Sequence, residues 1–174
     1  MKLTANSNDT YFVTLTIVYW IDIFTRLQYK DLIIDNLGYC RKEKVLEIYS
    51  YVIMSNHLHM IARSTEKPLS DVLRDFKTYT SKELYKMIKS NPQECRRNWM
   101  VKLFENAGKF NGLNKNFQVW QNKNQPIIMT NNKQFLIKQN YIHQNPVLAG
   151  IVANDFDYLY SSACEDSPLK VDEY

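Results

Sequence analysis

Two histidines one residue apart, His57 and His59, are the side chains of this sequence best suited to bind a metal ion. They follow an apolar run (Tyr51–Met54) and a short Ser55-Asn56 step, and they lie in a second apolar run. Side chains alternate between the two faces of a β-strand, so both imidazoles would point to one face and Leu58 to the other. Two imidazoles on one face can share a divalent cation. The alternative is a pair of half-buried histidines on an exposed sheet face.

The segments around this pair alternate between strand and helix patterns. β-Branched and aromatic runs predict strands, and apolar residues at helical spacing predict helices. The predicted strands are 11–19, 45–54, 56–63 and a short 117–121, and the predicted helices are 26–40, 67–90, 94–105 and 131–143, with Asn145-Pro146 ending the last. The short turn at 55–56 predicts an antiparallel hairpin. This order predicts an α+β, ferredoxin-like fold, an antiparallel sheet with helices mainly on one face.

The whole chain limits the classes of protein to consider. Its 174 residues predict one domain, 1–174, with a mobile acidic tail from about residue 165. Lys and Arg number 22 against 18 Asp and Glu, a mild basic bias compatible with a nucleic-acid partner. The three cysteines form no CxxC pair, which favours reduced thiols in a cytoplasmic protein. No apolar run is long enough for a leader or a membrane span, so we expect no membrane partner.

The long helix after the hairpin carries basic residues beside its apolar stripe. These side chains either form a solvated face or contact DNA phosphates. The candidate DNA-binding residues are Arg74, Lys77, Lys82 and Lys86, with Lys123 from a later polar segment. Tyr79 falls on the apolar stripe, where a core aromatic is the ordinary expectation.

Four motifs in one order carry a family resemblance. They are Ser55–His59 (SNHLH), Phe117–Gln121 (FQVWQ), Tyr141–Val147 (YIHQNPV) with AGIV at 149–152, and Tyr158–Ala163 (YLYSSA). The set resembles the REP-associated tyrosine transposases, which belong to the single-tyrosine HUH transposases of small insertion sequences. The resemblance extends from Tyr11 to Ala163, and the combination in register is far more specific than the His-x-His pair alone.

The resemblance implies a ferredoxin-like HUH endonuclease that acts in DNA transposition. His57 and His59 would match the paired ligands of Mg²⁺ or Mn²⁺, and the partner would be single-stranded or hairpin DNA. A tyrosine would attack a DNA phosphate and leave a 5′-phosphotyrosine with a free 3′-OH. Members act as monomers or as homodimers.

The sequence departs from this family at the expected nucleophile. Related transposases place the tyrosine four residues after the Trp of the WQ motif, and that position here is Asn124. A third metal ligand often follows one helical turn later, where this chain has Ile128. An amide cannot replace a phenol as nucleophile, and an isobutyl-type side chain cannot coordinate a metal.

Other residues could fill the two vacant roles. Tyr141 and Tyr79 are the candidate substitute nucleophiles, and Gln125 or Gln121 could supply the third ligand. His143 is a weaker candidate ligand, because a histidine near a helix C-terminus also complements the helix dipole.

Three functions therefore remain open on the sequence. The first is metal-dependent cleavage and strand transfer of single-stranded or hairpin DNA. The second is a domesticated DNA-binding module without covalent tyrosine chemistry, which Asn124 favours. The third is a metal-dependent phosphodiesterase that uses water as nucleophile.

Overall fold

The computed structural model describes residues 8–44, 46–110 and 116–174. In this part of the chain a sheet is formed by β1 (Tyr11–Thr16), β2 (Leu46–Ile53), β3 (His57–Ser64) and β4 (Ile127–Ile128). The strand order is β2-β3-β1-β4, and every neighbouring pair is antiparallel. This order, with one helix between β1 and β2 and another after β3, confirms the α+β, ferredoxin-like prediction.

The β2–β3 hairpin places the two histidines as the alternation predicted. Thr14 pairs with His59 across β1 and β3, and Thr16 pairs with His57. Because directly paired residues of an antiparallel sheet share a face, these four side chains lie on one face of the sheet. Leu58 on the opposite face is fully buried.

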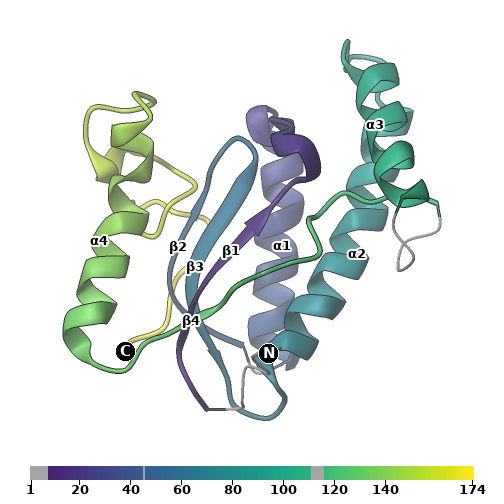
Figure 1. The fold of residues 1–174 in the computed structure, drawn as a ribbon. Helices are drawn as coiled ribbons and strands as arrows, with labels where there is room; N and C mark the ends of the chain where they lie inside the picture. Colours follow the sequence, from purple (N-terminus) through teal and green to yellow (C-terminus); the bar gives the residue numbers. More distant parts are fainter. Residues whose placement is uncertain (1–7, 45, 111–115) are drawn as a thin grey trace.

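Helices cover both faces of the sheet. Helices α1 (Leu27–Lys44) and α2 (Leu69–Ser90) lie together on one side, and α3 (Arg97–Lys109) packs beyond α2 (Figure 1). Helix α4 (Asn132–Leu148) lies on the other side, against β2 and β3 (Figure 1). The face that carries the histidines is therefore the face that α4 covers.

The predicted strand at 117–121 is wrong, although the segment does follow β1. It forms only an isolated bridge between Trp120 and Ile17, and regular pairing begins later, at β4. Trp120 is buried in the core, and its indole Nε1 donates a hydrogen bond to Thr80 Oγ1 at 2.9 Å. The Gln121 amide still donates to the Thr16 carbonyl of β1, but the Gln121 carbonyl accepts a hydrogen bond from Lys77 of α2, and no pairing with β1 follows until β4 in this described stretch.

The predicted end of the last helix is also wrong. Helix α4 runs through Pro146 to Leu148. A proline in a helix removes one backbone donor. In the last turn this costs little, and the Ala149 and Gly150 amides still close the helix on the Asn145 and Val147 carbonyls.

The C-terminal residues run along the free edge of β2. The Ile53 amide donates to the Tyr160 carbonyl, and the Ser162 amide donates to the Tyr51 carbonyl. Asp172 pairs with Arg41, and Leu169 is buried. The segment from about residue 165, for which we predicted mobility, thus has defined contacts with the domain. No helix in the described ranges is long and apolar enough to cross a membrane.

Candidate metal and DNA site

The two histidine rings of β3 face each other on the α4 side of the sheet. Their centroids are 4.6 Å apart with an interplanar angle of 70°. His59 is buried, and His57 is half-buried at the end of the strand nearer to solvent. The rings are close enough to bind one ion.

Asn56 determines which nitrogen of His57 can bind a metal. Its Nδ2 donates to Asp22 Oδ1 at 2.9 Å and to the Trp20 carbonyl at 3.2 Å. Both partners are acceptors, so the amide orientation is fixed and Oδ1 faces His57 Nδ1, 2.7 Å away. A carbonyl oxygen only accepts, so Nδ1 of His57 carries the proton. The lone pair of Nε2 is then the one left for a metal.

Thr14 has the corresponding place beside His59. Its hydroxyl lies 2.8 Å from His59 Nδ1. The ring is also stacked on Phe12, with centroids 5.4 Å apart. These contacts hold the ring plane and leave Nε2 of His59 as the nitrogen for a ligand role.

We expect Thr14→Val to weaken Mn²⁺ binding about tenfold to a hundredfold, because partners of ligating histidines contribute that much to metal affinity. Valine keeps the shape of the side chain and removes the hydroxyl. Calorimetric titration with Mn²⁺ measures the change, and Thr78→Val on the exposed face of α2 is the matched control. Equal affinities for wild type and Thr14→Val would show that the hydroxyl does not orient a ligand.

Burial keeps both rings in the form that binds metals. Desolvation, the main cause, together with the nearby His57 and Lys138 charges, lowers the pKa of His59 to about 3. Desolvation also lowers the pKa of His57, against the opposing charge of Asp22. Both imidazoles are therefore neutral at neutral pH, and no proton has to leave when an ion binds.

Tyr141 of α4 lies beside His59. Its ring is edge-on to His59, with centroids 5.2 Å apart, and edge-on to Phe12 at 6.0 Å. The Tyr141 residue is 42% exposed to solvent. Lys138 Nζ lies 5.5 Å from the Tyr141 ring centroid and 4.6 Å from that of Phe12. The histidines, a tyrosine and a cation thus meet on one face.

The donor set suits a divalent cation that takes its remaining ligands from water or substrate. Imidazole nitrogens are borderline donors, so they fit a first-row transition ion such as Mn²⁺ better than Mg²⁺, which prefers oxygen ligands. Among the described residues no cluster of three or more His, Cys, Asp and Glu side chains could hold a metal. Two neutral imidazoles with oriented Nε2 atoms fit such an ion as a partial site.

Asn124, at the expected nucleophile position, has its side chain in contact with α2. Its Oδ1 accepts a hydrogen bond from Lys77 Nζ at 3.3 Å, and the same ammonium donates to the Gln121 carbonyl. Lys77 belongs to α2, which packs on the sheet face opposite the histidines. Lys77, which we predicted to bind DNA, thus links α2 to the 121–125 segment.

We expect the Lys77 ammonium to give stability a pH dependence. Burial lowers its pKa to about 8, below the ~10.4 of an unfolded lysine. Between these values the unfolded chain binds more proton, so this contribution to the unfolding free energy rises with pH. We measure the unfolding free energy of wild type and of Lys77→Met by denaturant titration from about pH 7 to 10. The wild-type value should rise relative to that of the variant by at most about 3 kcal/mol. A difference that stays constant with pH would contradict this.

The other predicted site residues make contacts of their own. Tyr79 is 52% exposed on α2, so the expectation of a core aromatic is wrong; its neighbour Thr80 takes the buried position.

Gln121 Nε2 donates to the Ile17 carbonyl at 3.5 Å, and Gln125 is exposed. Ile128 pairs with Tyr11 in the sheet. His143 Nε2 lies within hydrogen-bond distance of Ser50 and Ser162, a packing role.

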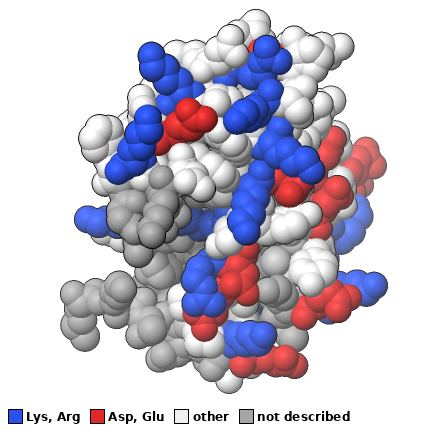
Figure 2. All heavy atoms as spheres, turned by 90° about the vertical axis from the view of Figure 1, so that its right-hand side faces the viewer, with Lys and Arg blue, Asp and Glu red and all other residues white. Residues whose placement is uncertain are grey.

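The outer face of α2 and α3 carries much of the exposed positive charge. Figure 2 shows Lys and Arg spread over this face between acidic side chains. Arg74 is paired with Asp71 and Asp75, which neutralise it locally, whereas Lys82, Lys86 and Lys123 are exposed. Because α2 and the histidines lie on opposite faces of the sheet, DNA that touches both must pass around its edge.

Comparison with known proteins decides the family. Residues 9–107, more than half of the chain, match the family described as "Transposase IS200 like". The chain belongs to the IS200-like transposase family. The match ends before Asn124 and Tyr141, so it covers the histidine pair and leaves the nucleophile position outside. No curated protein matches this transposase-family chain.

Two solved structures resemble the domain. A REP-associated tyrosine transposase bound to a REP hairpin superposes with a TM-score of 0.64 at 19% identity, over 91% of this chain and 78% of that one. A transposase described as putative from Deinococcus radiodurans gives a TM-score of 0.47 at 13% identity, over 76% of this chain and 87% of that one. The first supports the same α+β fold.

Four residues of the candidate site were not foreseen from the sequence. Thr14 and Asn56 orient the histidines, while Phe12 and Lys138 line the space beside Tyr141. The alternation of residues in 11–16 is the signal that could have placed Thr14 on the same face as Phe12. No local pattern marks Lys138, because only the docking of α4 brings it to β1.

Proposed function

We propose that this protein cleaves and rejoins single-stranded or hairpin DNA, with Mg²⁺ or Mn²⁺ at His57 and His59 and with Tyr141 as the nucleophile. The observation that carries the proposal is the position of Tyr141. Its exposed ring lies edge-on to His59, on the sheet face that presents both imidazoles. Family membership and a fold neighbour that holds a REP hairpin support DNA as the substrate class.

The chemical step exchanges one phosphodiester bond for another. The Tyr141 phenolate oxygen attacks the scissile phosphorus, and the bond from phosphorus to the 3′ oxygen breaks. The phenolic proton goes to solvent, and the departing 3′ oxygen takes up a proton. The product is a 5′-phosphotyrosine with a free 3′-OH, and attack by another 3′-OH reverses the step and joins strands.

The residues around the tyrosine position the reactants. His57 and His59 would hold the ion through their Nε2 atoms, while Asn56 and Thr14 fix their orientation. The bound ion would polarise the phosphate as a Lewis acid. Lys138 places a positive charge beside Phe12 and Tyr141, where it can bind a phosphate oxygen of the strand.

An adduct assay tests this proposal. The purified protein is incubated in Mn²⁺ with hairpin oligonucleotides that carry single-stranded flanks, drawn from the DNA around its own gene. A denaturing gel then reveals a band that contains protein and DNA, and mass spectrometry of the peptide locates the modified residue. The proposal expects the adduct on Tyr141 and its loss in EDTA; cleavage without any adduct would instead indicate water as the nucleophile.

A second function, DNA binding without cleavage, is favoured by one observation. At the family's nucleophile position stands Asn124, whose side chain is engaged by Lys77. A chain that had lost its chemistry would keep the fold and the exposed basic residues. Binding of the hairpins with no cleavage in Mn²⁺, across several flanking sequences, would select this function.

A further inference from the structure

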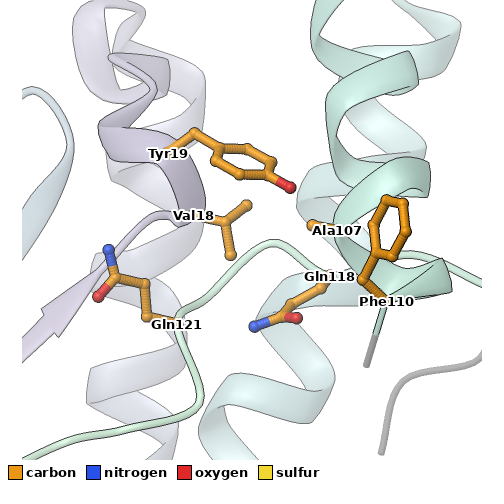
Figure 3. A pocket seen from close by; sticks show the side chains of 6 residues that line it. All are labelled: Val18, Tyr19, Ala107, Phe110, Gln118 and Gln121. Atoms are coloured by element: carbon orange, nitrogen blue, oxygen red, sulfur yellow. The ribbon is translucent and has the colours of Figure 1, made fainter. Parts of the chain in front are cut away.

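A cavity lies beyond the end of β1, on the α3 side of the domain. Its volume is about 410 Å³, within the range of about 300–1,000 Å³ typical of small-ligand sites. Its walls are Tyr19 and Phe110, and its floor includes Val18, Gln118 and Gln121 (Figure 3). It lies between the short 3-10 helix η1 (Val18–Trp20) and the C-terminal end of α3. None of its wall residues takes part in the proposed cleavage.

Two aromatic side chains stand open on opposite walls. Tyr19 is 56% exposed and Phe110 is 89% exposed. In Figure 3 the Tyr19 ring extends from η1 toward α3, and the Phe110 ring stands at the end of α3. Exposed aromatic rings beside a cavity are the usual platforms on which unpaired bases stack, because every base has a π face.

The backbone of η1 is held in an unusual conformation that presents Tyr19. Tyr19 and Trp20 have φ of 55° and 54°, a left-handed region that bulky residues rarely adopt. Asn56 accounts for part of this, because its Nδ2 binds the Trp20 carbonyl while its Oδ1 orients His57. The segment that forms one wall is therefore tied to the candidate metal site through a single side chain.

The floor of the cavity is held in place by internal hydrogen bonds. Gln118 Nε2 donates to the Trp120 carbonyl at 2.8 Å and to Asn122 Oδ1 at 3.3 Å, and Gln121 Nε2 donates to the Ile17 carbonyl at 3.5 Å. The floor is held close to α3 by Gly108, where an added Cβ would lie 2.6 Å from Phe117 Cα. The Gln118 backbone amide donates to the Phe104 carbonyl at 2.9 Å, which fixes the segment that forms the floor.

The segment that carries Tyr19 also reaches the histidine pair. The Trp20 ring lies edge-on to His57, with centroids 6.1 Å apart, and Tyr19 is the preceding residue. Lys109, exposed at the end of α3, places a positive charge beside Phe110 for the adjoining phosphate. We propose that the cavity between Tyr19 and Phe110 receives one unpaired nucleobase of the substrate strand; this rests on the proposed function and assigns part of its DNA specificity to this cavity.

A coupling experiment tests the proposal. The probes are hairpin oligonucleotides with a single-stranded flank in which each flank nucleotide in turn lacks its base. Binding is measured by fluorescence anisotropy in EDTA for wild type, Tyr19→Ala and Phe110→Ala, and for Tyr39→Ala, an equally exposed tyrosine on α1, as control. We expect binding about tenfold weaker for each cavity variant and unchanged for the control. At one flank position, removal of the base should weaken binding to wild type about tenfold and leave binding to Tyr19→Ala unchanged.

Two outcomes would overturn the cavity proposal. One is a loss from base removal that is the same in wild type and Tyr19→Ala at every flank position. The other is wild-type affinity in both cavity variants, which would assign the cavity to a ligand other than DNA. Adduct formation on Tyr141 in Mn²⁺ is scored separately on the same oligonucleotides. Coupling without an adduct would reject the cleavage mechanism alone, and an adduct without coupling would reject the cavity alone.

Discussion

Tyr141→Phe is expected to abolish the covalent protein–DNA adduct and to reduce Mn²⁺-dependent cleavage by at least about a thousandfold. The change removes one oxygen atom and keeps the ring that packs edge-on against His59 and Phe12. Phenylalanine has no atom that can attack phosphorus, so no weaker version of the same step remains. The folded structure and the affinity for hairpin DNA should stay within about twofold of wild type, because the ring contacts are kept. Denaturing gels measure the adduct, and anisotropy measures the binding.

Tyr79→Phe is the matched control for this variant. Tyr79 is also an exposed tyrosine, at 52%, but it lies on α2 and therefore on the other side of the sheet. It should form the adduct at the wild-type rate. An adduct that persists in Tyr141→Phe and vanishes in Tyr79→Phe would move the nucleophile to α2, and cleavage that survives both changes would indicate water.

Most of the fold could be predicted from the sequence because each element is specified by its own local residue pattern. Runs such as 11–16 and 46–53 are β-branched and aromatic, and the 69–90 segment keeps helical spacing, so each element is specified by its own residues. The hairpin register also follows from alternation, which is why His57 and His59 were correctly placed on one face. Wrong details arose where tertiary contacts override local pattern. The segment at 117–121 has strand composition, but its Trp120 is fixed by a contact with Thr80 of α2.

Only part of the candidate site could be predicted from the sequence, because the rest depends on contacts between residues far apart in the chain. A ligand pair at i and i+2 on one strand is visible in the sequence. The contact between His59 and Tyr141 joins residues far apart in the chain, and no local rule measures that distance. Tyr141 could be named only as a chemically able residue, beside Tyr79. Docking of α4 on the histidine face separates the two candidates, because it brings one to the pair and leaves the other on the far side.

Replacing His57 by alanine is expected to weaken Mn²⁺ binding by more than about a hundredfold, since the loss of a ligand should exceed the loss of an orienting partner. His57 is half-buried at the strand end, so alanine there leaves the sheet intact. Adduct formation should fall in parallel, and excess Mn²⁺ should restore part of it. The affinity of wild type should be nearly independent of pH near neutrality, because the pKa of His59 is about 3 and that of His57 is also lowered.

The third histidine of the chain provides the control for this prediction. His143 lies on α4, and its Nε2 is within hydrogen-bond distance of Ser50 and Ser162. That nitrogen is therefore engaged by the two serines and is not directed at His57 and His59. His143→Gln keeps a polar group for the serines and should leave Mn²⁺ affinity unchanged. If His143→Gln lost the metal as completely as His57→Ala, His143 would belong to the ligand set after all. If neither variant changed Mn²⁺ binding, the ion would lie elsewhere, and the pair on β3 would be two half-buried histidines that pack under α4.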